Sequence, residues 1–210
     1  MIIADTIYDA WVDATRYVMK NGKELLDERG RIVREVNNLM VRILNSAKTK
    51  KSHPYWDGDK LERYIDQFRE KNPGFSYTYG DRIRYHFDVN QYESVVKRLS
   101  DEPVTRRAIM ITYDPVIDSY RKEIPCLILL SFMIREDEFH RRRLHVTGVW
   151  RSHDIFGAYY PNLYGVMCVA EYIAARLGVE VGEIITHSIS AHIYVDEATQ
   201  EELSRLGVIG

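Results

Sequence analysis

The segment from Tyr159 to Leu177 most constrains how this chain can fold. Its apolar residues recur at helical spacing and nearly encircle the helix that this spacing predicts. They are Leu163, Val166, Met167, Ala170, Ile173, Ala174 and Leu177. A helix that is apolar on most of its surface must be enclosed by other elements, so this segment predicts a long buried core helix. Gly178 follows it as the expected C-terminal cap.

The rest of the chain supplies both helices and strands to surround that helix. Further helices are expected at residues 7–18, 61–68, 89–99 and 197–206, the second of them ended by Asn72-Pro73-Gly74. Strands are expected at residues 33–43, 108–113, 125–134, 144–150 and 181–194. Because helices and strands do not alternate strictly, the order favours one α+β domain over residues 1–210, with a mixed sheet flanked by helices.

Composition excludes several classes of protein. A formal net charge of −2 argues against a nucleic-acid or anionic-membrane surface, where a basic excess is expected. The longest apolar run, residues 124–134, is about half of the ~20 residues that a spanning helix needs. The N-terminus becomes charged too early for a signal peptide. We therefore expect a cytoplasmic protein that binds neither nucleic acid nor a membrane.

The two cysteines of the chain, Cys126 and Cys168, are too few for a disulfide framework and fit a reducing compartment. Cys168 lies on the predicted core helix and is expected to be an inert buried thiol. A free cysteine in an apolar strand is most often the same, so Cys126 taken alone would suggest no function. Its neighbours along the chain change that interpretation.

Cys126 belongs to a series of polar residues whose order and spacing resemble the active-site signature of the thymidylate synthase family. The matching groups are Arg106-Arg107, Pro125-Cys126, Arg151-Ser152-x-Asp154, Asn162 and His192-x-Tyr194. The 20 residues from Arg106 to Cys126 and the 11 from Arg151 to Asn162 equal the family intervals. The resemblance covers roughly residues 100–196, and Arg29-Gly30 is a shorter echo upstream.

The resemblance implies the family's α+β fold and the methylation of dUMP to dTMP. The strands that carry Cys126, Arg151 and His192 would form one sheet. Cys126 would add as a thiolate to C6 of the pyrimidine, and C5 would then attack a one-carbon unit from a reduced methylene-pterin. That donor would be 5,10-methylenetetrahydrofolate or methylenetetrahydromethanopterin, with no metal. Arg151 would favour the thiolate, because a free thiol with a pKa of about 8.5 is mostly protonated at pH 7.

The same resemblance assigns contacts to the nucleotide. Four arginines and a serine would hold the phosphate: Arg29, Arg106, Arg107, Arg151 and Ser152. His192 and Tyr194 would bind the deoxyribose 3′-hydroxyl, and Asp154 would lie near the pterin. Asn162 would pair with O4 and N3–H of uracil, whereas related enzymes that act on dCMP carry aspartate at this position.

In the family, the paired arginines reach across a two-fold interface into the partner's site. Arg106 and Arg107 therefore imply a homodimer, with the backs of the two sheets paired. The chain departs from the family at Leu127, where histidine is usual, at Trp150, where glutamine is usual, and at Ser190-Ala191, where Gly-Asp is usual.

The family's catalytic glutamate has no clean counterpart; Asp66 is the nearest candidate and Glu62 the next. The short chain resembles the archaeal branch of the family, whose donor can be a modified pterin, so the identity of the donor stays open.

Three other functions share parts of the pattern. A pyrimidine-nucleotide hydroxymethylase uses the same covalent addition but ends with water in place of hydride, a step that the sequence does not determine. A non-catalytic nucleotide-binding relative would need no nucleophile, which Cys126 argues against. A thiol-dependent hydrolase would need a base such as His192 beside the thiol, and it leaves the other spacings unexplained. We expect a thymidylate synthase.

Overall fold

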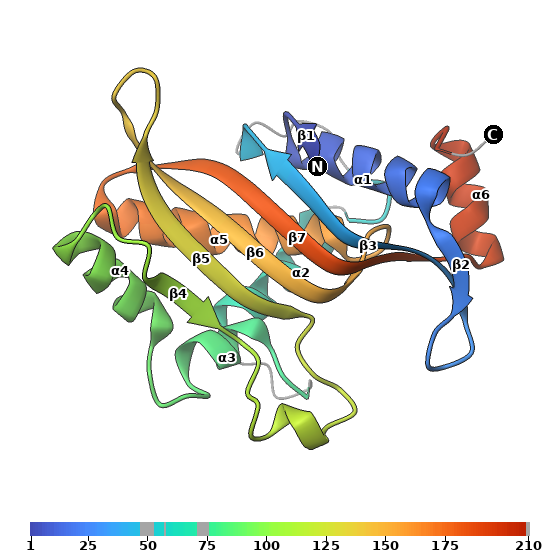
Figure 1. Ribbon diagram of the computed structural model, residues 1–210, viewed down its shortest axis with the longest axis horizontal. Helices are drawn as coiled ribbons and strands as arrows, with labels where there is room; N and C mark the ends of the chain where they lie inside the picture. The colour runs from blue at the N-terminus through green and yellow to red at the C-terminus, as the bar shows by residue number, and fades with distance from the viewer. Residues whose placement is uncertain (47–52, 57, 71–75, 209–210) are drawn as a thin grey trace.

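The computed structural model describes residues 1–46, 53–56, 58–70 and 76–208. Its strands form one seven-stranded sheet in the order β1-β3-β7-β6-β5-β4, with β2 also paired to β3 (Figure 1). The strands are β1 Ile2–Ala4, β2 Lys23–Leu26, β3 Ile32–Ile43, β4 Ala108–Ile111, β5 Leu127–Glu136, β6 Arg142–Asp154 and β7 Glu180–Tyr194. Two pairs, β1 with β3 and β6 with β7, are parallel and the others antiparallel, so the sheet is mixed, as expected.

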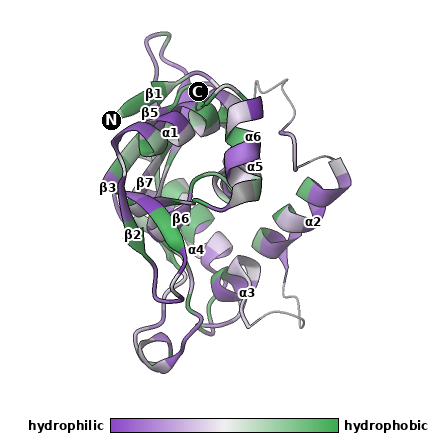
Figure 2. Ribbon diagram, turned by 90° about the vertical axis from the view of Figure 1, so that its right-hand side faces the viewer, coloured by the Kyte–Doolittle hydropathy of each residue, from purple (hydrophilic) through white to green (hydrophobic). Residues whose placement is uncertain are grey.

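The helices gather on one side of this sheet. They are α1 Ile7–Asn21, α2 Gly58–Arg69, α3 Tyr79–Arg84, α4 Gln91–Asp101, α5 Tyr159–Leu177 and α6 Glu197–Arg205, with a short 3₁₀ turn at Asp118–Tyr120. Figure 2 shows strands β2, β3 and β7 at the left and helices α2, α3, α5 and α6 at the right. In the part of the chain that the structure describes, no helix covers the opposite face of the sheet. None of the described helices is long and apolar enough to span a membrane.

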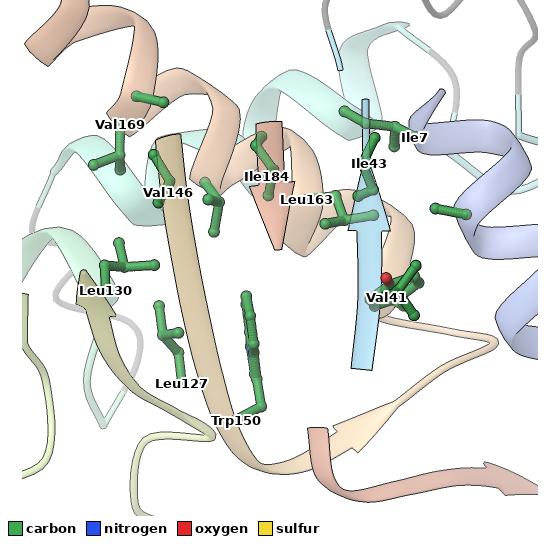
Figure 3. Close-up of a cluster of buried hydrophobic side chains, with 14 of the residues drawn as sticks. Ile7, Val41, Ile43, Leu127, Leu130, Val146, Trp150, Leu163, Val169 and Ile184 are labelled. Carbon is green, nitrogen blue, oxygen red and sulfur yellow. The ribbon is translucent and has the colours of Figure 1, made fainter. Parts of the chain in front are cut away.

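Helix α5 is the enclosed helix that the sequence predicts, with the predicted bounds. It contacts α1, α2 and α4 as well as strands β6 and β7. Figure 3 shows Leu163 and Val169 of this helix packed with Val146 and Ile184 of the sheet. Gly178 ends the helix in the left-handed region at φ +63°, as expected for its cap.

Helix α2 lies directly on α5 because one residue of α5 has no side chain. A Cβ atom built at Gly165 would lie 2.2 Å from the ring of Phe68, which is buried on α2. The ring of Phe68 therefore occupies the space that any other residue at position 165 would fill. Tyr64 and Asn162 lie about one turn earlier on their helices, so the same packing brings them together.

The structure departs from the sequence expectations mainly in short elements and strand ends. Strands β1 and β2 and helix α3 were not predicted; each has six residues or fewer, too few to show a clear period. Strand β6 continues to Asp154 because its pairing with β7 extends to the Asp154–His192 pair. Cys126 comes immediately before β5. The expected helix end at Asn72-Pro73-Gly74 lies outside the described residues.

Candidate active site

A pocket of about 400 Å³ lies where the ends of β6 and β7 meet α2, α3 and the start of α5. One wall, the sheet wall, consists of Cys126, Ser152, His153, Asp154, His192 and Tyr194. The facing wall, the helix wall, consists of Tyr64, Gln67, the segment Ser76–Tyr79, Ala158 and Asn162. Glu123, from the segment before β5, also lines the pocket. Of the residues predicted to act on or bind the nucleotide and the pterin, all except the four arginines therefore line one pocket.

Strand pairing explains how distant parts of the sequence meet in the sheet wall. Strands β6 and β7 run parallel, and their register places Asp154 beside His192. The main-chain N–H of Arg151 donates to the carbonyl oxygen of Cys126 at 2.8 Å, which joins β6 to the start of β5. The prediction that Cys126, Arg151 and His192 belong to one sheet is confirmed.

Arg151 is held against the Cys126 thiol by the main chain. Its Nε donates to the carbonyl oxygen of Pro125, and a terminal nitrogen donates to that of Ile124, both at 3.0 Å. The same terminal nitrogen lies 3.8 Å from Cys126 Sγ. Because the guanidinium is fixed by two carbonyl groups, its charge stays beside the sulfur.

The electrostatics of Cys126 differ from the sequence expectation in their net direction. Burial raises the pKa of the thiol, and it outweighs the charge of Arg151 and a hydrogen bond from the side chain of Tyr77, both of which lower it. Burial also raises the pKa of Tyr77 to about 12, so its hydroxyl remains a donor at neutral pH. Arg151 acts on the thiol in the expected sense, but the protein without nucleotide favours the neutral thiol.

Asn162 belongs to a buried chain of hydrogen bonds. Its Oδ1 accepts from the hydroxyl of Tyr64 at 2.8 Å, and its Nδ2 lies 3.1 Å from Nε2 of His153. Nδ1 of His153 lies 2.9 Å from the hydroxyl oxygen of Ser188, and its ring stacks on Trp150 at 4.4 Å. Burial holds the pKa of His153 well below its usual range, so the ring is neutral and one of its nitrogens can accept.

Asp154 lines the pocket and also stabilises a turn through a hydrogen bond. Its Oδ1 accepts from the main-chain N–H of Gly157 at 3.0 Å, which stabilises the turn that leads into α5. Burial raises the pKa of its carboxyl group above the usual range. A carboxyl group in this state can donate as well as accept a hydrogen bond.

Three of the arginines predicted to bind phosphate lie away from the pocket lining. Arg29 is exposed in the turn between β2 and β3, where its main-chain N–H donates to Asp27. Arg106 is exposed before β4, and Arg107 pairs with Glu102 at 2.8 Å. Within one chain, these side chains are not brought to the site.

Arg31 contacts Tyr194, a residue of the pocket lining, and was not among the predicted site residues. Its guanidinium lies 4.0 Å from the centre of the Tyr194 ring and donates to the Tyr194 hydroxyl at 2.8 Å. The pairing of β3 with β7, in register at Val33 and Tyr194, places it there. Arg31 follows directly after Arg29-Gly30 in the sequence, and this proximity was the signal that could have pointed to it. It does not predict the register of β3 with β7, which places Arg31 beside Tyr194.

The carboxylates proposed to replace the catalytic glutamate are wrong as pocket residues. Asp66 and Glu62 are exposed and pair with Arg69 at 3.1 and 3.4 Å. Helical spacing turns Tyr64 and Gln67 to the pocket instead, because they lie on the other face of α2.

Cys168 is also not the buried inert thiol that was expected, since it is half-buried and accepts from Nε of Arg69 at 3.0 Å.

Comparison with known proteins identifies the family. The sequence model of thymidylate synthase matches residues 15–206. This chain belongs to the thymidylate synthase family. Relatives called "Putative thymidylate synthase" include one from Methanothermobacter thermautotrophicus, 42% identical over 92% of both chains. Another, from Methanosarcina acetivorans, is 40% identical over 92% of this chain and 89% of its own.

A solved structure confirms the thymidylate synthase fold. Thymidylate synthase from T4 phage superposes with a TM-score of 0.73, over 91% of this chain and 78% of that one. The two sequences are 17% identical, so this match speaks for the fold alone.

Thymidylate synthases use a folate-type one-carbon donor, and the pocket suits such a group. Its volume lies in the range of small-molecule sites, roughly 300–1,000 Å³. Asp154 and Tyr77 line the pocket, where a carboxyl group would suit the polar edge of a pterin and an aromatic ring would suit its flat face. Among the described residues, no group of His, Cys, Asp and Glu is placed to hold a metal ion.

Proposed function

We propose that this protein is a thymidylate synthase that converts dUMP to dTMP, with 5,10-methylenetetrahydrofolate or methylenetetrahydromethanopterin as donor. The observation that carries the proposal is the Cys126 thiol, which lies 3.8 Å from the fixed guanidinium of Arg151. Asn162, an amide suited to the edge of uracil, lines the same pocket. The whole chain, residues 1–210, acts as a single domain.

Cys126 is the nucleophile of the proposed reaction. Its thiol loses a proton and the sulfur bonds to C6 of the pyrimidine, while the electrons of the C5–C6 double bond move toward O4 and make C5 nucleophilic. Because burial opposes the thiolate, Arg151 and the Tyr77 hydroxyl are the groups that stabilise it. A bound reduced methylene-pterin supplies the one-carbon unit and the hydride that reduces it to a methyl group. C5 bonds to that unit and releases its proton to water. The Cys126 sulfur then leaves C6 with the electrons of the S–C6 bond as the C5–C6 double bond re-forms.

The remaining residues bind and orient the nucleotide and the donor. Arg151 and Ser152 bind the phosphate, and Arg29 joins them only if the turn between β2 and β3, which lies away from the pocket in the single chain, moves toward it. His192 and Tyr194 bind the 3′-hydroxyl group, and Asp154 orients the pterin.

A homodimer would complete the phosphate site with Arg106 and Arg107 of the partner. The uncovered face of the sheet supports this proposal, because four of its strands carry apolar side chains there, between polar ones such as Ser131, Thr147 and His187. Its side chains include Ile109, Leu129, Met133, Val149, Ile185 and Ile189. Ile109 and Ile189 are 48% and 41% exposed in the single chain, and exposed apolar side chains that gather on one face are typical of a protein interface.

Release of tritium from [5-³H]dUMP tests the reaction, because substitution at C5 must displace the label into water. Each of the two donors is supplied in turn, and the products are separated by chromatography. We expect donor-dependent release and dTMP as the product. Cys126→Ser should abolish release, whereas the matched variant Cys168→Ser should retain it. Hydroxymethyl-dUMP as the product would establish the hydroxymethylase instead. No release with either donor, despite dUMP binding, would favour a nucleotide-binding relative.

A further inference from the structure

Asn162 by itself does not decide which pyrimidine is read. A carboxamide carries one donor group and one acceptor group, and half a turn about the Cβ–Cγ bond exchanges their positions. Uracil presents the acceptor O4 beside the donor N3–H, whereas cytosine presents a donor amino group beside the acceptor N3. The same asparagine complements uracil in one orientation and cytosine in the other. Discrimination between uracil and cytosine therefore depends on which side chains hold the amide in one orientation.

Two side chains hold it from opposite sides. The Tyr64 hydroxyl, from α2, lies 2.8 Å from Oδ1, and Nε2 of His153, from β6, lies 3.1 Å from Nδ2. The series continues to Ser188 on β7, 2.9 Å from Nδ1 of His153. Asn162, His153 and Ser188 are at most 3% exposed, so water competes little for these bonds.

The contacts along this series hold the amide in one orientation. In the orientation of the structure, Tyr64 donates to Oδ1, Nδ2 donates to Nε2 of His153, and Nδ1–H of His153 donates to Ser188. Tyr64 O–H, Nδ2–H and Nδ1–H then each have an acceptor, and the Ser188 hydroxyl oxygen accepts. In the reversed orientation Nδ2 would face the oxygen of Tyr64, and the phenolic proton of this half-buried side chain would lose its acceptor on Asn162. Burial raises the pKa of Tyr64, so that proton is retained.

We propose that Tyr64 and His153 are positioning residues that set a preference for uracil by fixing the orientation of the Asn162 carboxamide. The proposal rests on the proposed function, because it assumes a pyrimidine nucleotide in the pocket. It places the C4 substituent of the base on the His153 side and N3 on the Tyr64 side. The second N–H of Nδ2 then meets O4, and the second lone pair of Oδ1 meets N3–H.

The test compares binding of dUMP and dCMP to the full chain by calorimetry. Tyr64→Phe removes only the hydroxyl group, so the ring still packs against its neighbours. We expect the preference for dUMP over dCMP to fall at least tenfold, through weaker dUMP binding together with stronger dCMP binding. Tyr92→Phe is the matched control, because its buried hydroxyl donates to the Phe68 carbonyl at 3.1 Å outside the pocket. Its preference should equal that of the wild type.

A second readout does not depend on nucleotide binding. ¹⁵N NMR of the histidine rings should show His153 with its proton on Nδ1 and a bare Nε2. Ser188→Ala removes the acceptor that favours this tautomer, and we expect it to lower the preference for dUMP as well. A proton on Nε2 in the wild type would overturn the proposed orientation.

The outcomes separate the two proposals. Wild-type protein that binds neither nucleotide would overturn the proposed function, together with the specificity that rests on it. Binding of dUMP with an unchanged preference in Tyr64→Phe would overturn the role of Tyr64 alone and leave the proposed function standing.

Discussion

The two walls of the pocket differ in how their residues are held. In the sheet wall, Cys126, Asp154 and His192 lie on or beside long paired strands whose register fixes their separations. In the helix wall, Tyr64 depends on the packing of α2 against Gly165 of α5. Spacing along the chain therefore predicts most of the sheet wall but, in the helix wall, only Asn162. In the proposed reaction, the sheet wall attacks the pyrimidine and contacts between the two walls choose the base.

The largest expected effect concerns the sheet wall. Arg151→Gln removes the charge beside Cys126 and leaves burial unopposed, so the pKa of the thiol should rise further. Loss of a buried charge that stabilises a reacting anion typically lowers kcat by roughly 10²–10³-fold. Alkylation of Cys126 measured against pH checks the pKa. The control Arg176→Gln, at an exposed pair with Glu93, should change neither quantity. An unchanged alkylation profile in Arg151→Gln would contradict the assigned role.

A smaller effect is expected where the walls meet. Asn162→Asp replaces the amide donor with a carboxylate oxygen, which suits the cytosine amino group and lies beside the bare Nε2 of His153. Relief of that repulsion requires His153 to move its proton to Nε2. We expect selectivity to shift toward dCMP by roughly 10- to 100-fold, the scale of about 1–3 kcal/mol for an unpaired buried polar group. Competition between dUMP and dCMP measures the shift. If Asn162→Asp kept the preference of the wild type, Asn162 would not recognise the base.

The packing that holds the helix wall can be disturbed without touching the pocket. Gly165→Ala places a Cβ atom against Phe68, so α2 must move and carry Tyr64 away from Asn162. Overpacking of this kind costs about 1–3 kcal/mol in the free energy of unfolding. Urea denaturation measures it, and Gly58→Ala, where the added atom meets open space, is the control. Equal stability of the two variants would show that α2 is not held by this contact.

The smallest effect is a dependence of stability on pH at Asp154. Its pKa is raised in the folded protein, so the folded state binds the proton more tightly than the unfolded state. Ionisation therefore destabilises the wild type as the pH rises from the usual carboxyl range through the raised pKa. Asp154→Asn should be the more stable protein at pH 7, and the difference should vanish at a pH below the usual carboxyl range. The exposed Asp101→Asn is the control. A difference that grows on acidification would contradict the raised pKa.

Hydrophobic periodicity and residue spacing predict the long helix and the strands of the sheet wall. The bounds of α5 and the assembly of Cys126, Arg151 and His192 in one sheet were predicted correctly, because helical period and strand pairing act over many residues. Tyr64 was seen only as part of a helix, since its partner Asn162 is distant in the sequence and the contact depends on Gly165. The net pKa of Cys126 also escaped prediction, because burial is a property of the folded chain.

The most direct test of the account is a covalent bond between Cys126 and the pyrimidine. With 5-fluoro-dUMP and the active donor, C5 cannot release its substituent as a proton, so the adduct at C6 should persist. Mass spectrometry of the digested protein should find the nucleotide on the peptide that contains Cys126. Label on the peptide of Cys168, or no label from protein that turns over dUMP, would contradict the central role of Cys126.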